Sequence, residues 1–414
     1  MSQLTEIRRW AVLAFLLALA SCNNDYGCWN CGSSSLTSSF TPTEVSFGLV
    51  AGNFNNNGHT SVLATSTVLY NPQVNPGSLK SYLSTGAGTF AAPALTPDGD
   101  DPLYLASADL NGDKLLDVVS ASYSDGALAV FFNSAQNPGT FSTPLILSSP
   151  GASQVAIGDL NGDGLPDLVS ADFNVSLFIQ TSPGAFATPI GLYPGGANWV
   201  AVGDLNGDGA QDVALTDDVG VKVLLHTGAV SATTFAAPIT VFTQTVNADV
   251  IGANVIAIAD VNGDGFNDLV ITDPGPTGGA APTVSVLLQD ATHPGQFLAA
   301  VSYPTAPGSL AQSIVVTDIN GDGHPDIVIG GTNAVTVLLQ NASSPGTFMA
   351  AANYAVMNSN QIAIADVNGD GHLDIIVGTG VSQTIINGVI TNNPGVLLQN
   401  AGSPGTFGAL EDLP

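Results

Sequence analysis

The chain has 414 residues, of which 45% are hydrophobic, and it carries 33 acidic against 5 basic side chains, for a formal net charge of −28. Arg8 and Arg9 are its only arginines, so the rest of the chain cannot neutralise a run of phosphates, which excludes a nucleic-acid partner. The high content of Val, Ile and Leu also excludes a disordered polyanion, and cations are the natural partners of the negative charge.

Residues 1–21 are typical of an export signal. Arg8 and Arg9 precede an unbroken apolar run over residues 11–20, which is too short to span a bilayer as a helix. The next residues complete the sequence "LASC", which ends at Cys22 and resembles the lipobox of bacterial lipoproteins. This resemblance implies cleavage before Cys22 and lipidation of its thiol, while an ordinary secretory signal is the alternative. We therefore expect an exported protein, either secreted or held on the membrane by lipid alone and facing the periplasm or the cell exterior.

Residues 22–44 are typical of a flexible tether, because residues 33–39 are mostly serine. Cys28 and Cys31 lie in this segment as Cys-Trp-Asn-Cys. A structural zinc site would need a second pair of ligands, which the chain does not offer, and a redox motif would need a βαβ context. The two cysteines form a disulfide or remain unreacted thiols, and the sequence leaves both possibilities open.

Residues 45–414 contain two alternating landmarks, and each recurs at intervals of roughly fifty residues. The first is a nine-residue stretch such as "DLNGDGLPD", and intact copies begin at Asp109, Asp159, Asp204, Asp260, Asp318 and Asp366. A degenerate copy, "NFNNNGHTS", begins at Asn53. The second is a phenylalanine in a Pro-Gly-x-Phe-like setting, found at Phe90, Phe141, Phe186, Phe235, Phe297, Phe348 and Phe407. The chain therefore contains seven repeat units, and these make one domain despite its length.

Each unit contains four short β-type segments and no sustained helical periodicity. An alternating segment such as "QVAIGD" leads into the nine-residue stretch, and a β-branched run such as "DIVIG" leaves it. A third run such as "VTVLLQN" follows, and the Phe landmark opens the fourth. Four antiparallel strands repeated seven times predict an all-β fold, a seven-bladed β-propeller of four-stranded blades. A β-solenoid is the runner-up, but its calcium-binding form repeats every nine residues.

The nine-residue stretch offers oxygen ligands at alternating positions, with Asp, Asn and Asp at positions 1, 3 and 5, usually Gly at position 6, and Asp at position 9. Oxygen-only ligands with several carboxylates suit Ca²⁺ better than Mg²⁺ or Zn²⁺, and the carbonyl of position 7 would complete the ring. An EF-hand begins alike but requires a glutamate at position 12 and flanking helices. Position 12 is instead a serine or an aliphatic residue inside a predicted strand, so we exclude the EF-hand.

The six intact copies resemble the FG-GAP (VCBS-type) repeats of integrin α-subunit propellers and their bacterial relatives. The resemblance implies calcium loops between strands, about six bound Ca²⁺ ions, and ligands at positions 1, 3, 5 and 9 together with the position-7 carbonyl. Matched position by position, these ligands are Asp109, Asn111, Asp113, Asp117, Asp159, Asn161, Asp163, Asp167, Asp204, Asn206, Asp208, Asp212, Asp260, Asn262, Asp264, Asp268, Asp318, Asn320, Asp322, Asp326, Asp366, Asn368, Asp370 and Asp374.

Two copies depart from this pattern. Lys114 replaces the position-6 glycine, so we expect a weaker site there. The copy that begins at Asn53 has no carboxylate, so we expect no metal in it. Solvated aspartates in Asx turns would be the structural alternative, but six recurrences in a chain with few charged residues favour metal binding.

The composition favours a monomeric binding module for a glycan or protein partner over an enzyme. Catalysis on acidic sugars would need a base and cationic groups, and only three lysines and five histidines lie beyond Arg9. An extracellular polysaccharide lyase or hydrolase is the alternative. The connections between strands 2 and 3 vary most in length, at residues 67–79, 273–282 and 380–395, and we expect the partner on that face, opposite the calcium loops.

Overall fold

The computed structural model describes residues 43–69, 77–99, 101–227, 234–243, 255–274, 282–379, 385–386, 389–390 and 394–413. The chain divides into two compact units, Met1–Thr41 and Pro42–Pro414, and all described residues belong to the second. The predicted signal and the three cysteines lie outside the described residues. A search of the described part found no helix that is long and apolar enough to cross a membrane.

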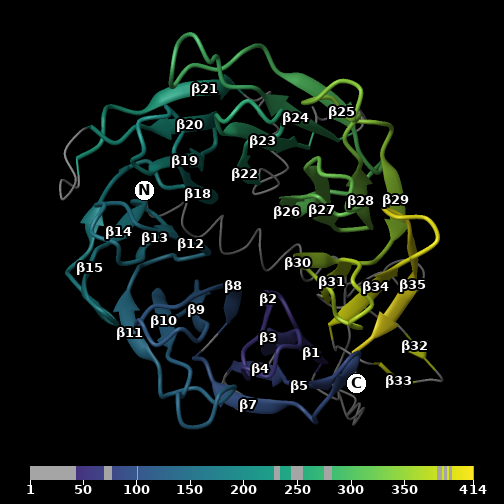
Figure 1. The fold of residues 1–414 in the computed structure, drawn as a ribbon. Coiled ribbons are helices and arrows are strands. Elements are labelled where there is room, and N and C mark those ends of the chain that lie inside the picture. Colours follow the sequence, from purple (N-terminus) through teal and green to yellow (C-terminus); the bar gives the residue numbers. More distant parts are fainter. Residues whose placement is uncertain are drawn as a thin grey trace, which may run out of the picture. The chain divides into compact units, whose positions relative to one another are not determined.

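The second unit is a seven-bladed β-propeller of four-stranded antiparallel blades, which confirms the predicted fold class (Figure 1). In blade 1, β1 (Thr43–Val45) and β2 (Leu49–Gly52) both pair with β3 (Ser61–Leu69), and β4 (Ser78–Tyr82) and β7 (Ala94–Pro97) follow outward. The strands of blades 2 to 4, from the centre outward, are β8 (Pro102–Ala108), β9 (Asp117–Ser122), β10 (Ala127–Phe131) and β11 (Leu145–Ser148); β12 (Gln154–Gly158), β13 (Asp167–Ala171), β14 (Ser176–Phe178) and β17 (Ile190–Gly191); and β18 (Trp199–Gly203), β19 (Asp212–Thr216), β20 (Gly220–Leu224) and β21 (Ile239–Thr243).

The remaining blades repeat this order. Their strands are β22 (Ile256–Ala259), β23 (Asp268–Asp273), β24 (Thr283–Leu287) and β25 (Val301–Pro304); β26 (Ala311–Thr317), β27 (Asp326–Gly331), β28 (Ala334–Leu338) and β29 (Ala352–Ala355); and β30 (Ser359–Ala365), β31 (Asp374–Thr379), β34 (Gly395–Gln399) and β35 (Phe407–Asp412). Three small hairpins complete the inventory: β5 (Ser84–Gly86) with β6 (Thr89–Phe90), β15 (Gln180–Ser182) with β16 (Ala185–Phe186), and β32 (Ile385–Ile386) with β33 (Val389–Ile390).

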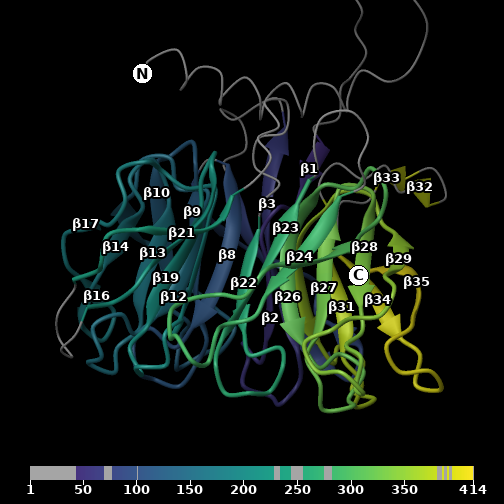
Figure 2. The ribbon, with the colours of Figure 1, turned by 90° about the horizontal axis from the view of Figure 1, so that it is seen from above.

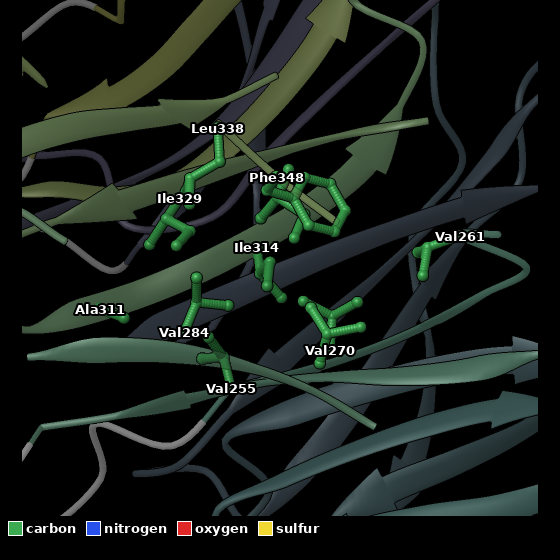
Figure 3. Packing of buried hydrophobic residues seen from close by; sticks show 11 residues of the cluster. Val255, Val261, Val270, Val284, Ala311, Ile314, Ile329, Leu338 and Phe348 are labelled. Atoms are coloured by element: carbon green, nitrogen blue, oxygen red, sulfur yellow. The ribbon is translucent and has the colours of Figure 1, made fainter. Parts of the chain in front are cut away.

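The hydrophobic core lies between neighbouring blades. In the cluster of Figure 3, Val270 and Val284 of blade 5 share one apolar layer with Ile314 and Ile329 of blade 6. The second strand of each blade is sandwiched by neighbours on both faces, and β9 is therefore buried at every position. Burial of such side chains contributes roughly 1.5–3 kcal/mol each, so each blade is stabilised mainly by the blades beside it.

Blades 1 and 7 close the ring by the same kind of contact, because Val62 and Tyr82 of blade 1 pack with Ile376 and Val396 of blade 7.

The Phe landmark was expected to open the fourth strand of each blade, and its position differs slightly from that expectation. In four blades it forms an isolated bridge with the end of the third strand, as in Gln340 with Phe348, and the fourth strand begins farther along the chain.

The connections of the blades fall on two faces (Figure 2). The connections between strands 1 and 2 and between strands 3 and 4 lie on one face, which we call the loop face. The connections between strands 2 and 3 and from one blade to the next lie on the opposite face. The three longest strand 2–3 connections, which the sequence singled out, lie mostly outside the described residues.

Candidate metal centres

All six intact copies of the nine-residue stretch connect the first strand of a blade to the second. Positions 1 and 3 are half-buried or buried, and position 5 is exposed. Position 9 is always the first residue of the second strand and has no exposed surface, at Asp117, Asp167, Asp212, Asp268, Asp326 and Asp374. The predicted ligands of each site therefore come from one tight loop and from the strand that follows it.

The aspartate at position 1 organises the turn by accepting backbone N–H groups. In blade 6, Asp318 Oδ1 accepts hydrogen bonds from the amides of Gly321 at 2.7 Å and Asp322 at 3.0 Å, and Asp318 Oδ2 accepts one from Gly323 at 2.7 Å. Gly323 has a φ of 87°, a conformation that side-chain-bearing residues rarely adopt. The turn itself therefore favours glycine at position 6.

Positions 3 and 5 bring their side chains together above this turn. Asn320 Oδ1 accepts the amide of Asp322 at 2.8 Å, and Asp322 Oδ1 accepts the amide of His324 at 2.9 Å. Asn320 Nδ2 donates to Asp322 Oδ2 at 3.1 Å, and the same Asn–Asp contact occurs in the other five loops. Three of the four predicted ligand side chains in each loop are therefore held in fixed positions by local hydrogen bonds.

The aspartate at position 9 joins the loop to the end of the third strand. Asp326 Oδ2 accepts the amide of Ile319 at 3.2 Å, and its Oδ1 accepts the amide of Gln340 at 2.7 Å. Burial, with a smaller contribution from the negative charge of Asp322, raises the pKa of Asp326 to about 6. Burial and nearby aspartates likewise raise the pKa to about 6 at Asp117, Asp167, Asp212 and Asp268, and raise it at Asp374.

The chemistry of the donor set fits a calcium ion. Each loop supplies three carboxylates and one amide oxygen and no nitrogen or sulfur ligand, which is the preference of Ca²⁺, and the mutual repulsion of the carboxylates is what a divalent cation would relieve. Among the described residues, however, no three Asp, Glu, His or Cys side chains form a group that could hold an ion. The assignment of calcium to these loops therefore stays a prediction.

The degenerate loop of blade 1 adopts the same turn without carboxylates. Asn53 Oδ1 accepts the amides of Asn57 at 3.0 Å and Gly58 at 3.2 Å. Asn55 and Asn57 donate through Nδ2 to the carbonyl oxygen of Ser84 at 2.8 and 2.7 Å. The side-chain amide N–H groups of this loop therefore donate to a backbone carbonyl oxygen, and the expectation that it holds no cation stays a prediction.

Lys114, at position 6 of the blade 2 loop, adopts the glycine conformation with a φ of 71°. Its amide donates to Asp109 Oδ2 at 2.8 Å, as the glycine amide does in the other loops. The turn is thus preserved at the expense of backbone strain. The expectation of a weaker site there is unchanged.

Where the structure describes the Phe-landmark turn of the next blade, the loop is also tied to that blade, which the sequence did not predict. Gln340 Nε2 of blade 6 donates to the carbonyl oxygen of Val261 in the blade 5 loop at 2.7 Å. Gly346, in the Pro-Gly-x-Phe turn of blade 6, has a φ of 78°, and a Cβ at this glycine would lie 3.1 Å from Cβ of Asn262. Equivalent contacts link blade 7 to the blade 6 loop. The alternation of the two landmarks was the signal in the sequence, because a nine-residue loop packs against the Phe-landmark turn of the next blade wherever the structure describes that turn.

The five histidines do not assemble a catalytic group. They lie in five different blades, at His59, His226, His293, His324 and His372. His226 is buried and packs edge-to-face on Phe235 at 5.4 Å, and His293 Nδ1 lies 2.9 Å from Asp290 Oδ2 on the surface. The expectation that they are parts of individual repeats, not members of one site, agrees with these positions.

A profile of the FG-GAP-like repeat matches five overlapping stretches, residues 109–170, 159–215, 204–271, 260–329 and 318–377. Each match runs from one predicted calcium loop to the second strand of the next blade, and together they cover more than half of the chain. No curated protein matches the sequence.

Two solved structures show the same fold. A lectin of Agrocybe aegerita that recognises non-reducing terminal N-acetylglucosamine is 19% identical, with a TM-score of 0.52, and the match covers 76% of this chain and 80% of the lectin. A protein from Lactobacillus plantarum is 15% identical, with a TM-score of 0.51 and coverage of 90% and 97%.

Proposed function

Because the chain belongs to the family of FG-GAP-like repeat proteins, we propose that it is an exported calcium-binding β-propeller that acts as a cell-surface binding module for a glycan or protein partner. Lipidation of Cys22 would anchor it to the membrane, and export would place it where calcium is plentiful. Calcium would serve as structural support, because the predicted ligands lie in loops that accept hydrogen bonds from the following blade.

The observation that carries this proposal is a difference between the two faces of the propeller: the loops on one face are nearly constant, and the connections on the other vary in length. The loop face repeats one hydrogen-bonded loop in seven blades, and those loops bind the ring together. The connections that vary in length, at residues 67–79, 273–282 and 380–395, leave from strand ends at the opposite face. Variable connections on a rigid scaffold are where binding usually resides. The lectin that shares the fold makes sugars the first partners to test.

A non-catalytic role agrees with the family, since FG-GAP-like repeat propellers are generally non-catalytic. Incubation with acidic and neutral polysaccharides tests this directly. Release of reducing sugars or of unsaturated products would reveal a carbohydrate-active enzyme instead, a hydrolase or a lyase.

A glycan array probed with and without calcium tests the binding role. We expect binding that survives Asp322→Ala in the loop of blade 6, as long as the protein stays folded, and that is lost when residues 275–281 are deleted from the opposite face. If the deletion leaves binding intact and the folded Asp322→Ala protein has lost it, the roles of the two faces are reversed.

Labelling cells with a fatty-acid probe tests the anchor separately. We expect the wild-type protein to incorporate the probe and the Cys22→Ser variant not to. Equal behaviour of the two would identify an ordinary secretory signal.

A further inference from the structure

The central channel of the propeller contains a cavity of about 360 Å³, walled by the inner strands of blades 2 to 6. These strands, from β8 through β26, surround the centre of the ring in Figure 1. The volume falls in the range of small-molecule binding sites, roughly 300–1,000 Å³. A second pocket, between blades 5 and 6, holds about 10 Å³, which is room for about one water molecule, so the channel cavity is the candidate for a ligand.

Small residues create the open space. In four successive blades the third residue before the loop lines the cavity, and it is alanine each time, at Ala106, Ala156, Ala201 and Ala257. Two positions earlier the side chains are large in three of these blades, where Tyr104, Gln154 and Trp199 line the cavity. Because the inner strands run toward the loop face, these three residues lie at the other end of the channel, nearer the opposite face.

Tyr104 and Trp199 form an aromatic pair at this end. Their ring centroids are 5.2 Å apart with an interplanar angle of 85°, and both residues are half-buried. The pair joins blade 2 to blade 4, with Gln154 of blade 3 at the same level between them. Edge-to-face contact leaves ring surface available for a ligand while each ring orients the other.

Neutral hydrogen-bonding groups accompany the pair. Gln154 Nε2 donates to the carbonyl oxygen of Val155 at 3.2 Å, and its Oε1 accepts the amide of Val200 at 3.1 Å, which fixes the side chain. Burial raises the pKa of Tyr104 to about 12, although the nearby Gln154 partly offsets this, so the phenol stays a neutral O–H group. Ser107 also lines the cavity and carries a hydroxyl.

None of the described residues that line the cavity is charged, although the chain carries a net charge of −28. An anionic ligand would be repelled by the surrounding charge. An organic cation is usually bound by aromatic faces with a carboxylate close by, and no described lining residue supplies one. Aromatic faces combined with neutral donors and acceptors match a ring with apolar C–H faces and equatorial hydroxyls.

We propose that this cavity is a binding site for a neutral pyranose, with Trp199 and Tyr104 packing on the sugar ring and Tyr104, Gln154 and Ser107 exchanging hydrogen bonds with its hydroxyls. The proposal deepens the proposed function and rests on it, because it locates the glycan site of the binding module. It places one sugar ring in the channel, at the end nearer the face of the variable connections, and leaves contacts with the rest of the glycan to those connections.

Intrinsic fluorescence gives a direct test, because the chain has three tryptophans, and only Trp199 lies in the propeller. In the full-length protein with Trp10→Phe and Trp29→Phe, all tryptophan emission reports on the cavity. We would titrate glucose, galactose, mannose and N-acetylglucosamine, each as its neutral methyl glycoside. We expect a saturable change in emission with at least one of them.

Variants then distinguish the contribution of aromatic stacking to sugar binding from that of the open cavity volume. Trp199→Ala removes the stacking ring, and calorimetry measures its binding. Ala156→Leu fills the cavity without touching the aromatic pair. Each variant should weaken binding about tenfold or more, equivalent to at least about 1.4 kcal/mol. Tyr104→Phe removes one hydrogen bond and should weaken binding by about fivefold. The matched control is Phe173→Ala, which breaks an edge-to-face pair away from the cavity, Tyr123 with Phe173 at 6.1 Å, and should bind as the wild type does.

The outcomes distinguish this inference from the proposed function. Sugar binding on an array without a change in Trp199 emission, or unchanged binding by Ala156→Leu and Trp199→Ala, would overturn the channel site and leave the binding module in place. A response to choline and to none of the sugars would also overturn it, in favour of an organic cation. Absence of any glycan binding by the folded, calcium-loaded protein would overturn the glycan function together with the site.

Discussion

The loop of blade 1, residues 53–61, and the loop of blade 6, residues 318–326, have the same shape and different chemistry. In both, the side chain at position 1 accepts the amides of positions 5 and 6. In both, the oxygen at position 5 accepts the amide of position 7 at 2.9 Å. Blade 1 achieves this with neutral asparagines, and blade 6 uses aspartates at positions 1, 5 and 9.

This comparison shows that the turn requires oxygen acceptors but not negative charge. Each of the other six loops nevertheless contains three carboxylates within nine residues. Burial and repulsion raise the pKa of the buried carboxylate at position 9, as at Asp326. The turn does not account for this charge, whereas a bound divalent cation would. Blade 1 is therefore an internal control for the calcium hypothesis.

Removal of calcium should have the largest effect. Bound metal stabilises only the native state, and a site with free calcium at ten times its Kd gains about 1.4 kcal/mol, or roughly 8 kcal/mol for six sites. For a protein of this size that corresponds to a fall in melting temperature of about 10 °C. Differential scanning calorimetry with excess EDTA measures it, and magnesium should restore less stability than calcium.

A melting temperature indifferent to EDTA would contradict the calcium assignment in all six loops. The number of sites can be checked independently by counting bound calcium in the dialysed protein. We expect six ions or, if the Lys114 loop is empty at the dialysis concentration, five, and none in blade 1.

Substitution at position 9 should cost more than substitution at position 5 when calcium is absent. Asp326 is buried and accepts two amides, so Asp326→Ala would leave two buried donors unpaired and lower the free energy of unfolding by roughly 2–6 kcal/mol. Asp322 is exposed, and its removal relieves repulsion, so Asp322→Ala should be nearly neutral in EDTA and destabilising only in calcium. Urea unfolding in both buffers measures the difference.

Blade 1 supplies the matched variant, since Ser61 occupies position 9 there and its Oγ accepts the amide of Ser84 at 3.0 Å. Asp326→Ser should therefore recover part of the stability that Asp326→Ala loses in EDTA, and none of the calcium binding. Equal stability of the Ala and Ser variants would show that the two hydrogen bonds are not the source of the loss.

The sequence was sufficient to predict the blades and the loops, because both follow from local patterns. Segments in which every second residue is apolar predict strands. A glycine between aspartates predicts a turn, because glycine can adopt a positive φ. The links between blades could not be predicted, because the contact of Gln340 with Val261 joins residues 79 positions apart. The cavity could not be predicted either. The alanines three residues before the loops look like ordinary strand residues in the sequence, and only the closed ring of blades places them around one channel.

Asp98 can be compared with Asp326, since both carboxylates are buried but only that of Asp326 has hydrogen-bond donors. Asp326 accepts two amides, whereas neither oxygen of Asp98, which is only 2% exposed, has a hydrogen-bond partner of normal geometry. Burial, augmented by the charge of Asp125 and partly offset by Ser120, raises the pKa of Asp98 to about 8. Asp98 is therefore protonated at neutral pH.

The sign of the pH dependence follows from this pKa. Between the unfolded pKa near 3.8 and the folded pKa near 8, the folded state binds a proton that the unfolded state does not, so stability falls as the pH rises through this window. Asp98→Asn should remove that dependence and be the more stable protein above pH 8, by on the order of a few kcal/mol. Melting curves from pH 5 to 9 in saturating calcium measure it, and parallel curves for the two proteins would contradict the assignment.

The smallest expected effect concerns Lys114, which departs from the pattern of the six carboxylate loops only at position 6. Its left-handed conformation, with a φ of 71°, costs roughly 1–2 kcal/mol for a residue with a side chain, while a glycine there would lose about 0.4–1 kcal/mol through the greater freedom of the unfolded chain. Lys114→Gly should therefore stabilise the calcium-free protein by at most about 1.6 kcal/mol, and removal of a positive charge beside Asp109 should strengthen calcium binding in blade 2. The reverse exchange, Gly164→Lys in the blade 3 loop, is the matched control, because Gly164 has a φ of 84° and no atom within 4 Å of its Cβ position. Calorimetric titration of both variants should show opposite shifts in the affinity of one site, and shifts of the same sign would mean that the charge and the backbone strain at position 6 do not govern calcium binding.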